Sequence, residues 1–355
     1  MVSSATDKNI SFRSQLTGEL SDFLQDENFA CSETTAVLVA LVAALSHYKE
    51  EGIVLSPEIY ICNDITKVTS LLQGVEFIKI GHGKHNAKIA IKILKECAPL
   101  AQNGWSIFIE QLSEEFVYGV FTASNLPLAL TPDEVLVGED DESFPVVIIS
   151  KLADNCVEVS GARGNRRCIH FSAVREDSPS PKDAIDKLAK SITLHVNNKY
   201  RSNTYRFVYK TLSNIFQQPH GALVVVLKRR CRKLPQSISD AVSLAKPILL
   251  VNRVSDFLTL KDNEAMIKLQ ATTSILAGMI HSDGIVVFRS DGAILGYRAF
   301  LNNSSHKSIA HENSGGARRR TYEALKKLVD KQNIMGVFFR SQDGYAEYYG
   351  RLDNE

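Results

Sequence analysis

The residues best suited to carry out chemistry lie in two short segments in the last third of the chain. Asp283 and Gly284 precede an apolar run, and further on a glycine pair leads into an arginine cluster: Gly315, Gly316, Ala317, Arg318, Arg319, Arg320 and Thr321. A guanidinium group can donate two parallel hydrogen bonds to phosphate oxygens. Glycines let the backbone approach an anion closely, and a carboxylate can bind a divalent metal. Positive charge is unfavourable at a helix amino terminus, so three arginines there indicate a bound anion. The pattern predicts that these residues bind the phosphates of a nucleotide and that Asp283 holds a metal ion.

Apolar runs around these segments predict the elements that hold them in place. The run at 285–288 predicts a buried strand, a helix is expected over 263–280, and another helix begins near Ala317. A second Asp-Gly pair starts at Asp291 between two apolar runs, which is a strong hairpin signal, so we expect that aspartate to be structural. Asp283 instead follows a helix and precedes a strand. Its carboxylate is therefore expected at a strand edge, facing the helix at Ala317.

Residues 221–355 resemble the diadenylate cyclase superfamily in the order of their expected elements. A strand and a helix come first, an Asp-Gly pair then leads into a strand and hairpin, and an arginine-rich helix and a further strand follow. That family has Asp-Gly-Ala at the start of a strand and Gly-Thr-Arg-His-Arg at the start of the next helix; the matching segments here are 283–285 and 316–320. The resemblance implies an α/β domain with a central mixed sheet flanked by helices. It also implies a site for ATP or a cyclic dinucleotide with Mg²⁺ or Mn²⁺, in which Asp283 holds the metal. A homo-oligomer, dimer or larger, is implied because two bound ATP molecules must face each other for the family's reaction.

Three departures from the family motif bear on activity. Ala317 stands where the family has threonine, Arg319 where it has the central histidine, and Ile285 where it has alanine. Phosphate binding tolerates such changes better than catalysis, because misplacement by ~1 Å can lower a rate about a hundredfold. The altered motif resembles nucleotide-sensor branches of the superfamily that are associated with bacterial defence signalling. We therefore expect a protein that senses a purine nucleotide or cyclic (di)nucleotide, with an effector protein as partner.

Two other functions stay open on the sequence alone. One is an active diadenylate cyclase, a nucleotidyltransferase that condenses two ATP into cyclic di-AMP, with Asp283 as its catalytic residue. The other is a nucleic-acid-binding adaptor that uses the arginine cluster and the basic run at 228–233. That run is otherwise expected to be a solvated turn, or to line the rim of the nucleotide site. The Gly-His-Gly-Lys-His segment at 81–85 lacks a full phosphate-loop pattern, so a plain loop is expected there.

The amino-acid composition limits the classes of protein to which the chain can belong. The chain has 355 residues, of which 44% are hydrophobic and 23% charged, so two globular domains are expected. A net charge of +1 excludes the global basic footprint of a protein that lives on nucleic acid or anionic lipid. The six cysteines occur singly, without Cys-x-x-Cys or a histidine at zinc spacing, which predicts reduced, buried thiols. The longest apolar run, at 36–45, is too short to span a bilayer and has no basic leader, so a cytoplasmic protein without membrane contact is expected.

Hydrophobic periodicity divides the chain into five parts. The first part has a weak helical pattern, the second alternates helices and strands as in a mixed α/β domain of unknown role, and a Ser- and Pro-containing segment then marks the boundary. The five parts are an amino-terminal arm (residues 1–32), a mixed α/β domain (33–174), a linker (175–183), connecting helices (184–220) and the expected nucleotide-binding domain (221–355).

Overall fold

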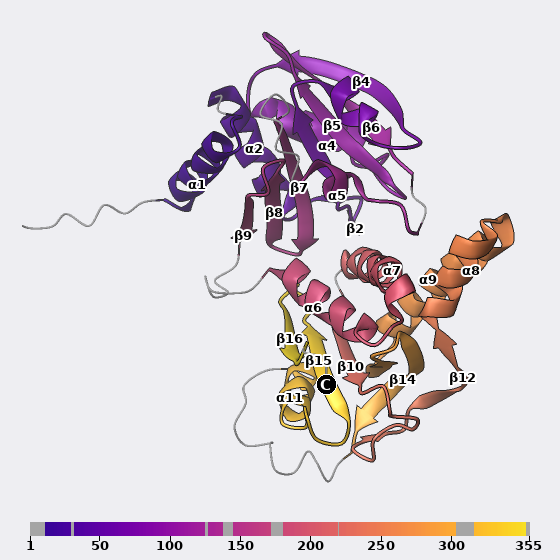
Figure 1. Cartoon of the computed structure of the whole chain (residues 1–355). Coiled ribbons are helices and arrows are strands. Elements are labelled where there is room, and N and C mark those ends of the chain that lie inside the picture. The colour runs from indigo at the N-terminus through magenta and orange to yellow at the C-terminus, as the bar shows by residue number, and fades with distance from the viewer. Residues whose placement is uncertain are drawn as a thin grey trace, which may run out of the picture. The chain divides into compact units, whose positions relative to one another are not determined.

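The computed structural model describes residues 11–29, 32–124, 127–137, 145–171, 180–218, 220–302 and 316–352. These residues form two compact units, each of mixed α and β structure as predicted (Figure 1). Unit 1 comprises residues 1–151 and 155–172, and unit 2 comprises residues 152–154 and 173–355. The predicted linker at 175–183 lies largely outside the described residues, but its end is helical because α6 begins at Pro181. None of the helices described is long and apolar enough to cross a bilayer.

Unit 1 is built on a seven-stranded sheet in the order β4-β6-β5-β3-β7-β8-β9, in which β3 and β5 are parallel. Its strands are β3 Ile59–Cys62, β4 Glu76–Lys84, β5 Trp105–Gln111, β6 Glu115–Thr122, β7 Val146–Ala153, β8 Cys156–Gly161 and β9 Arg166–His170, beside a small ribbon of β1 Lys49–Glu50 and β2 Ile53–Val54. Its helices are α1 Phe12–Asp26, α2 Ser32–Leu45, α3 Ile65–Ser70, α4 Lys88–Cys97 and α5 Pro132–Leu136.

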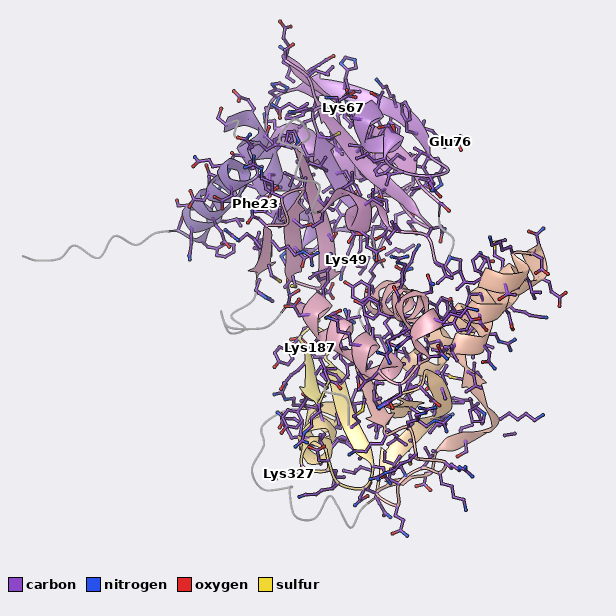
Figure 2. The ribbon with its side chains drawn as sticks, viewed as in Figure 1. Phe23, Lys49, Lys67, Glu76, Lys187 and Lys327 are labelled. Carbon is purple, nitrogen blue, oxygen red and sulfur yellow. The ribbon has the colours of Figure 1, made fainter. Side chains whose placement is uncertain are left out.

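Strand alternation sends apolar side chains to both faces of this sheet. Ile59 and Ile61 belong to a core cluster that also contains the buried faces of α1, α2 and α4, whereas Tyr60 packs in a second cluster with residues of α3 and α5. The predicted helical pattern at the start of the chain is confirmed, since α1 buries Phe23 in the first cluster, while charged residues such as Lys67 remain exposed (Figure 2). Unit 1 is thus a sheet covered by helices on both sides.

The loop predicted at 81–85 is wrong, because Gly81 to Lys84 continue strand β4. The glycines make room for side chains of neighbouring elements rather than for a phosphate. A Cβ on Gly81 would lie 2.4 Å from the Tyr118 hydroxyl oxygen, and one on Gly83 would lie 2.3 Å from Ile89 Cδ1. Close packing therefore explains a composition that is otherwise typical of loops.

Unit 2 has a second seven-stranded sheet, in the order β11-β14-β13-β10-β15-β16, with β12 also pairing with β14. Its strands are β10 Ala222–Leu227, β11 Ile238–Ser239, β12 Val242–Leu249, β13 Ile285–Arg289, β14 Ala293–Leu301, β15 Ile334–Arg340 and β16 Ala346–Gly350. Its helices are α6 Pro181–Thr193, α7 Asn198–Phe216, α8 Leu250–Leu260, α9 Asn263–His281 and α11 Ala317–Lys326.

Helices cover both faces of this sheet as well. Val225 and Phe339 pack in one cluster with Leu325 of α11. On the other face Phe216, at the end of α7, stacks on Phe338 of β15 with ring centroids 5.2 Å apart. The central strands β10 and β13 are parallel neighbours, so their amino ends lie at the same edge of the sheet.

The hairpin predicted at the second Asp-Gly pair is confirmed. Strands β13 and β14 are antiparallel and joined by residues 290–292, with Gly292 at a φ of +80°. The Asp291 carboxylate accepts two hydrogen bonds from the Arg289 guanidinium, at 2.9 and 2.8 Å. The Asp291 carboxylate therefore has a structural role in the turn between β13 and β14.

Candidate functional site at the amino edge of the parallel strands

Segments distant in the sequence meet where the parallel strands of unit 2 begin. Leu223 of β10 is in register with Ile285 of β13, so the residues before each strand, His220-Gly221 and Asp283-Gly284, come to the same edge. Antiparallel β15 ends at this edge too, because Ala222 pairs with Arg340. The amino end of α11 joins them through Arg318. We call the group of His220, His281, Asp283, Arg318 and the amino end of α11 the edge site.

An acidic and a basic side chain lie at the centre of the edge site. The Arg318 guanidinium lies 3.3 Å from the Asp283 carboxylate, and these side chains are 31% and 71% exposed. Gly221 gives the arginine its space, since a Cβ there would lie 3.0 Å from Arg318 Nη1. The acid and the arginine helix therefore face each other as predicted.

The amino end of α11 is not capped by a side chain of the described residues, and its first turn holds no acid. Its N-cap is Gly316, and a Cβ on that glycine would meet no atom within 4 Å. The first backbone N–H groups of a helix lack partners inside it and attract anions. This open end, beside Arg318, can accept negatively charged oxygens.

Two histidines that the sequence prediction did not single out border the same site. The rings of His220 and His281 lie 5.2 Å apart, and the Nε2 atom of each is buried without a hydrogen-bond partner among the described residues. Burial, followed by the nearby Arg318 charge, lowers the pKa of His220 and so favours the neutral form of its ring. Unpaired buried nitrogens are unfavourable, so they indicate a place for a ligand or water. The signal in the sequence is a histidine just before the start of each parallel strand.

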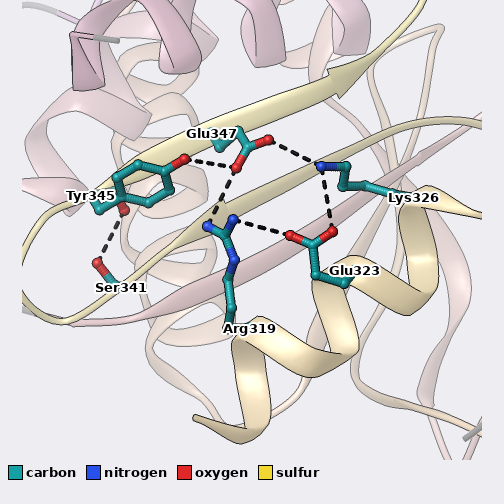
Figure 3. A network of polar contacts seen from close by, with 6 residues as sticks. All are labelled: Arg319, Glu323, Lys326, Ser341, Tyr345 and Glu347. Atoms are coloured by element: carbon teal, nitrogen blue, oxygen red, sulfur yellow. Dashed lines mark hydrogen bonds and ion pairs between the residues drawn. The ribbon is translucent and has the colours of Figure 1, made fainter. Parts of the chain in front are cut away.

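Arg319 lies in a network of its own on the side of α11 (Figure 3). Its guanidinium forms ion pairs with Glu323 at 3.0 Å and with Glu347 of β16 at 3.3 Å. It also lies over the ring of Tyr345, 5.2 Å from the centroid, and Lys326 pairs with both glutamates. The charge of Arg319 is thus balanced by side chains that hold α11 against the sheet.

The other predicted site residues are placed as follows. Arg320 and Ala317 are exposed on the first turns of α11, and the Thr321 hydroxyl donates a hydrogen bond of 3.0 Å to the Ala317 carbonyl within the helix. Gly284 forms the turn into β13 with a φ of +102°. Gly315 lies outside the described residues. The structure therefore brings together Asp283, Gly284, Gly316 and Arg318, while Arg319 faces elsewhere.

The described side chains around Asp283 do not supply a full set of ligands for a divalent metal ion. Of the described residues, one group of three potential ligand side chains meets within 4.8 Å, and it consists of Cys156, Cys168 and His170 in unit 1. Magnesium is commonly held by one or two carboxylates, with phosphates and water filling the other positions. The single exposed carboxylate of Asp283 fits that mode of binding when a nucleotide triphosphate is present.

The basic run at 228–233 follows β10 and so lies at the opposite end of this strand from the edge site. Arg230 donates to the Asn333 side chain at 3.2 Å, and the Cys231 carbonyl accepts a hydrogen bond from Arg289. The interpretation of the run as a rim of the nucleotide site is therefore wrong, because six strand residues separate the two.

Comparisons with known proteins give no independent assignment. The chain matches no known protein-family model, and no curated protein matches it significantly. Its function must therefore be argued from the residues of the edge site.

Proposed function

We propose that unit 2 binds a purine nucleotide or cyclic (di)nucleotide at the edge site and that the protein acts as a nucleotide sensor. The observation that carries the proposal is the pairing of Arg318 with an exposed Asp283 at the amino end of α11, which no side chain of the described residues caps. An arginine fork, free helix N–H groups and a carboxylate for a divalent ion are the groups that a polyphosphate requires.

In this proposal the phosphates bind at the amino end of α11. The Arg318 guanidinium turns from Asp283 to a phosphate oxygen, and the Asp283 carboxylate is then available to Mg²⁺ or Mn²⁺. His220 and His281 each have a ring nitrogen that can donate to or accept from the nucleotide, depending on the tautomer. A homo-oligomer and an effector protein are the partners proposed with this activity, by likeness to the sensor branches of the cyclase superfamily.

Sensing is favoured over cyclisation by the position of Arg319. The cyclase family has a histidine at that position of its motif, whereas Arg319 is bound to two glutamates and stacked on aromatic rings. A side chain held in this way does not reach the edge site to align reacting groups. The network holds α11 rigidly, and a rigid helix whose amino end binds phosphate is sufficient to bind a nucleotide without converting it to product.

Substitution of Arg318 by alanine is expected to weaken ATP binding about tenfold to a hundredfold. The reason is the loss of a charge-assisted hydrogen bond, which contributes about 1.5–3 kcal/mol. Isothermal titration calorimetry of the full chain with ATP and Mg²⁺, and separately with cyclic di-AMP, measures the change. The matched control is Arg229→Ala, an exposed arginine at the opposite end of β10, which should bind as the unmodified protein does.

Unmodified protein that binds neither ligand, or an Arg318→Ala variant of unchanged affinity, would contradict the proposal. Product analysis after incubation with ATP and Mn²⁺ completes the experiment. Formation of cyclic di-AMP that is lost in Asp283→Asn would replace sensing by the cyclase activity.

Substitution of Asp283 by asparagine is expected to reduce the gain in ATP affinity that Mg²⁺ provides. The amide cannot balance the charge of the ion, so the ratio of affinities with Mg²⁺ and with a chelator should move towards one. Affinity in the chelator should rise, because a carboxylate that repels phosphate and occupies Arg318 is gone. Asp343→Asn, which neutralises an exposed aspartate in the turn between β15 and β16, is the control. An unchanged ratio in Asp283→Asn would show that this carboxylate does not hold the ion.

A further inference from the structure

A cluster of two thiols and an imidazole lies in unit 1, on the hairpin that ends its sheet. Strands β8 and β9 pair antiparallel, with Cys156 opposite His170 and Glu158 opposite Cys168. Val157 and Ile169 point into the hydrophobic core, so by alternation these four residues lie on the other face of the hairpin. The sequence prediction treated the cysteines as separate, because the register that joins them cannot be read from their spacing.

The three side chains have the separations of a metal-binding group. The two Sγ atoms lie 3.4 Å apart, Cys168 Sγ lies 3.5 Å from His170 Nε2, and all three atoms lie within 4.8 Å of one another. Tetrahedral zinc with Zn–S near 2.3 Å and Zn–N near 2.0 Å requires S···S of about 3.8 Å and S···N of about 3.5 Å. Small side-chain movements therefore suffice to place one ion between these atoms.

The strand register favours a metal over a disulfide. Cys156 and Cys168 are diagonal neighbours rather than direct partners, since each faces a different residue. Diagonal positions in an antiparallel pair are roughly 7–8 Å apart, whereas disulfides need Cα atoms about 4.4–6.8 Å apart. A bridging ion spans the longer separation without a shift of the backbone.

The far end of the hairpin is anchored, which fixes the register that brings the three ligands together. Glu27, just after α1, accepts hydrogen bonds from the backbone N–H groups of Arg163 and Asn165, at 2.9 and 3.2 Å. Gly161 is required beside it, because a Cβ there would lie 2.0 Å from Glu27 Cδ. Such outer support keeps ligands in position before the ion arrives.

We propose that Cys156, Cys168 and His170 form a binding site for a zinc ion that holds the edge hairpin of unit 1. Two thiolates and an imidazole are ligands that zinc prefers, and since the described side chains supply these three, water or a further ligand would take the fourth position. The buried Glu158, in register with Cys168, lies on the same face of the hairpin as the three ligands. This site belongs to unit 1 and does not depend on nucleotide binding by unit 2.

Metal analysis tests the proposal directly. Protein purified without chelators should contain about one zinc per chain, and the chelated protein titrated with Co²⁺ should show thiolate-to-cobalt charge transfer. Cys156→Ser, Cys168→Ser and His170→Gln should each weaken zinc binding by at least about a hundredfold. Cys231→Ser in unit 2 is the control, since its hydroxyl can make the same bond to the Lys233 carbonyl, and it should leave binding unchanged.

The single tryptophan, Trp105 of β5, reports whether unit 1 stays folded in each variant. Three results would overturn the site: no zinc binding by chelator-treated protein with a native tryptophan spectrum, full affinity in the three ligand variants, or a Cys156–Cys168 disulfide found by mass spectrometry in natively purified protein.

Discussion

Replacing Arg340 by methionine is expected to lower the free energy of unfolding of unit 2 by about 3–5 kcal/mol. Arg340 is 1% exposed at the end of β15, an unusual place for a charged side chain. Its guanidinium donates to the carbonyls of Gln218 and His220, each at 2.9 Å, and lies over the Phe216 ring at 5.5 Å. Methionine fills a similar volume but loses the hydrogen bonds of a buried, charged guanidinium, which account for most of the expected loss.

The measurement should resolve unit 2 from unit 1. Hydrogen exchange of peptides from α7 and β10 should increase strongly in Arg340→Met, while the Trp105 fluorescence transition gives a comparison from unit 1. Arg340→Lys keeps the charge but loses the planar fork, so an intermediate loss is expected. Arg229→Met, which changes an exposed arginine, should stay within about 0.5 kcal/mol. Equal exchange in Arg340→Met and in the unmodified protein would refute the role assigned to these hydrogen bonds.

Replacing Gly284 by alanine is expected to destabilise unit 2 by about 2–4 kcal/mol and to weaken ATP binding as well. The backbone at Gly284 has a φ of +102°, which L side chains rarely adopt. A Cβ would also lie 2.9 Å from the carbonyl oxygen of Ala299 and 2.9 Å from Arg298 Cα, where β14 has an irregular register opposite β13. Backbone atoms cannot yield as a side chain can, so Asp283 and the start of β13 must move.

Gly278 offers a matched control in the helix just before this turn. It is exposed within α9, and a Cβ there would meet no atom within 4 Å. Gly278→Ala should therefore raise the stability of unit 2 by about 0.5–1 kcal/mol, because alanine favours the helix. Chemical unfolding followed by circular dichroism should thus give shifts of opposite sign. Similar shifts for both variants would mean that the turn at Gly284 tolerates a side chain.

Local patterns predicted much of the architecture because the relevant signals lie close together in the chain. The helix expected over 263–280 is α9, Asn263–His281, and the hairpin at Asp291 and Gly292 follows from turn chemistry. The meeting of Asp283 with the arginine helix was also predicted, from the position of Asp283 between a helix and a buried strand. The helix and the hairpin depend on signals between near neighbours in the chain, whereas the contact of Asp283 with Arg318 joins residues 35 positions apart.

The arrangement of the arginines required more than the order of the residues. Successive residues of an α-helix point about 100° apart, so Arg318 and Arg319 cannot face the same ligand. Which of them faces Asp283 depends on the rotation of α11, and that is set by apolar residues such as Leu325 packing on the sheet. Burial of Arg340 and the metal-like group at Cys168 depend on long-range pairing, which the sequence prediction could not supply.

The network around Arg319 restricts which residues this position can hold. Two glutamates, Glu323 and Glu347, now depend on it, with Lys326 as their other cation. A neutral side chain in place of Arg319 would leave these two acids with Lys326 as their one cation in the network. The three residues therefore act as one charge-balanced unit, so a neutral residue at position 319 is expected to be tolerated better when Glu323 and Glu347 are neutral as well.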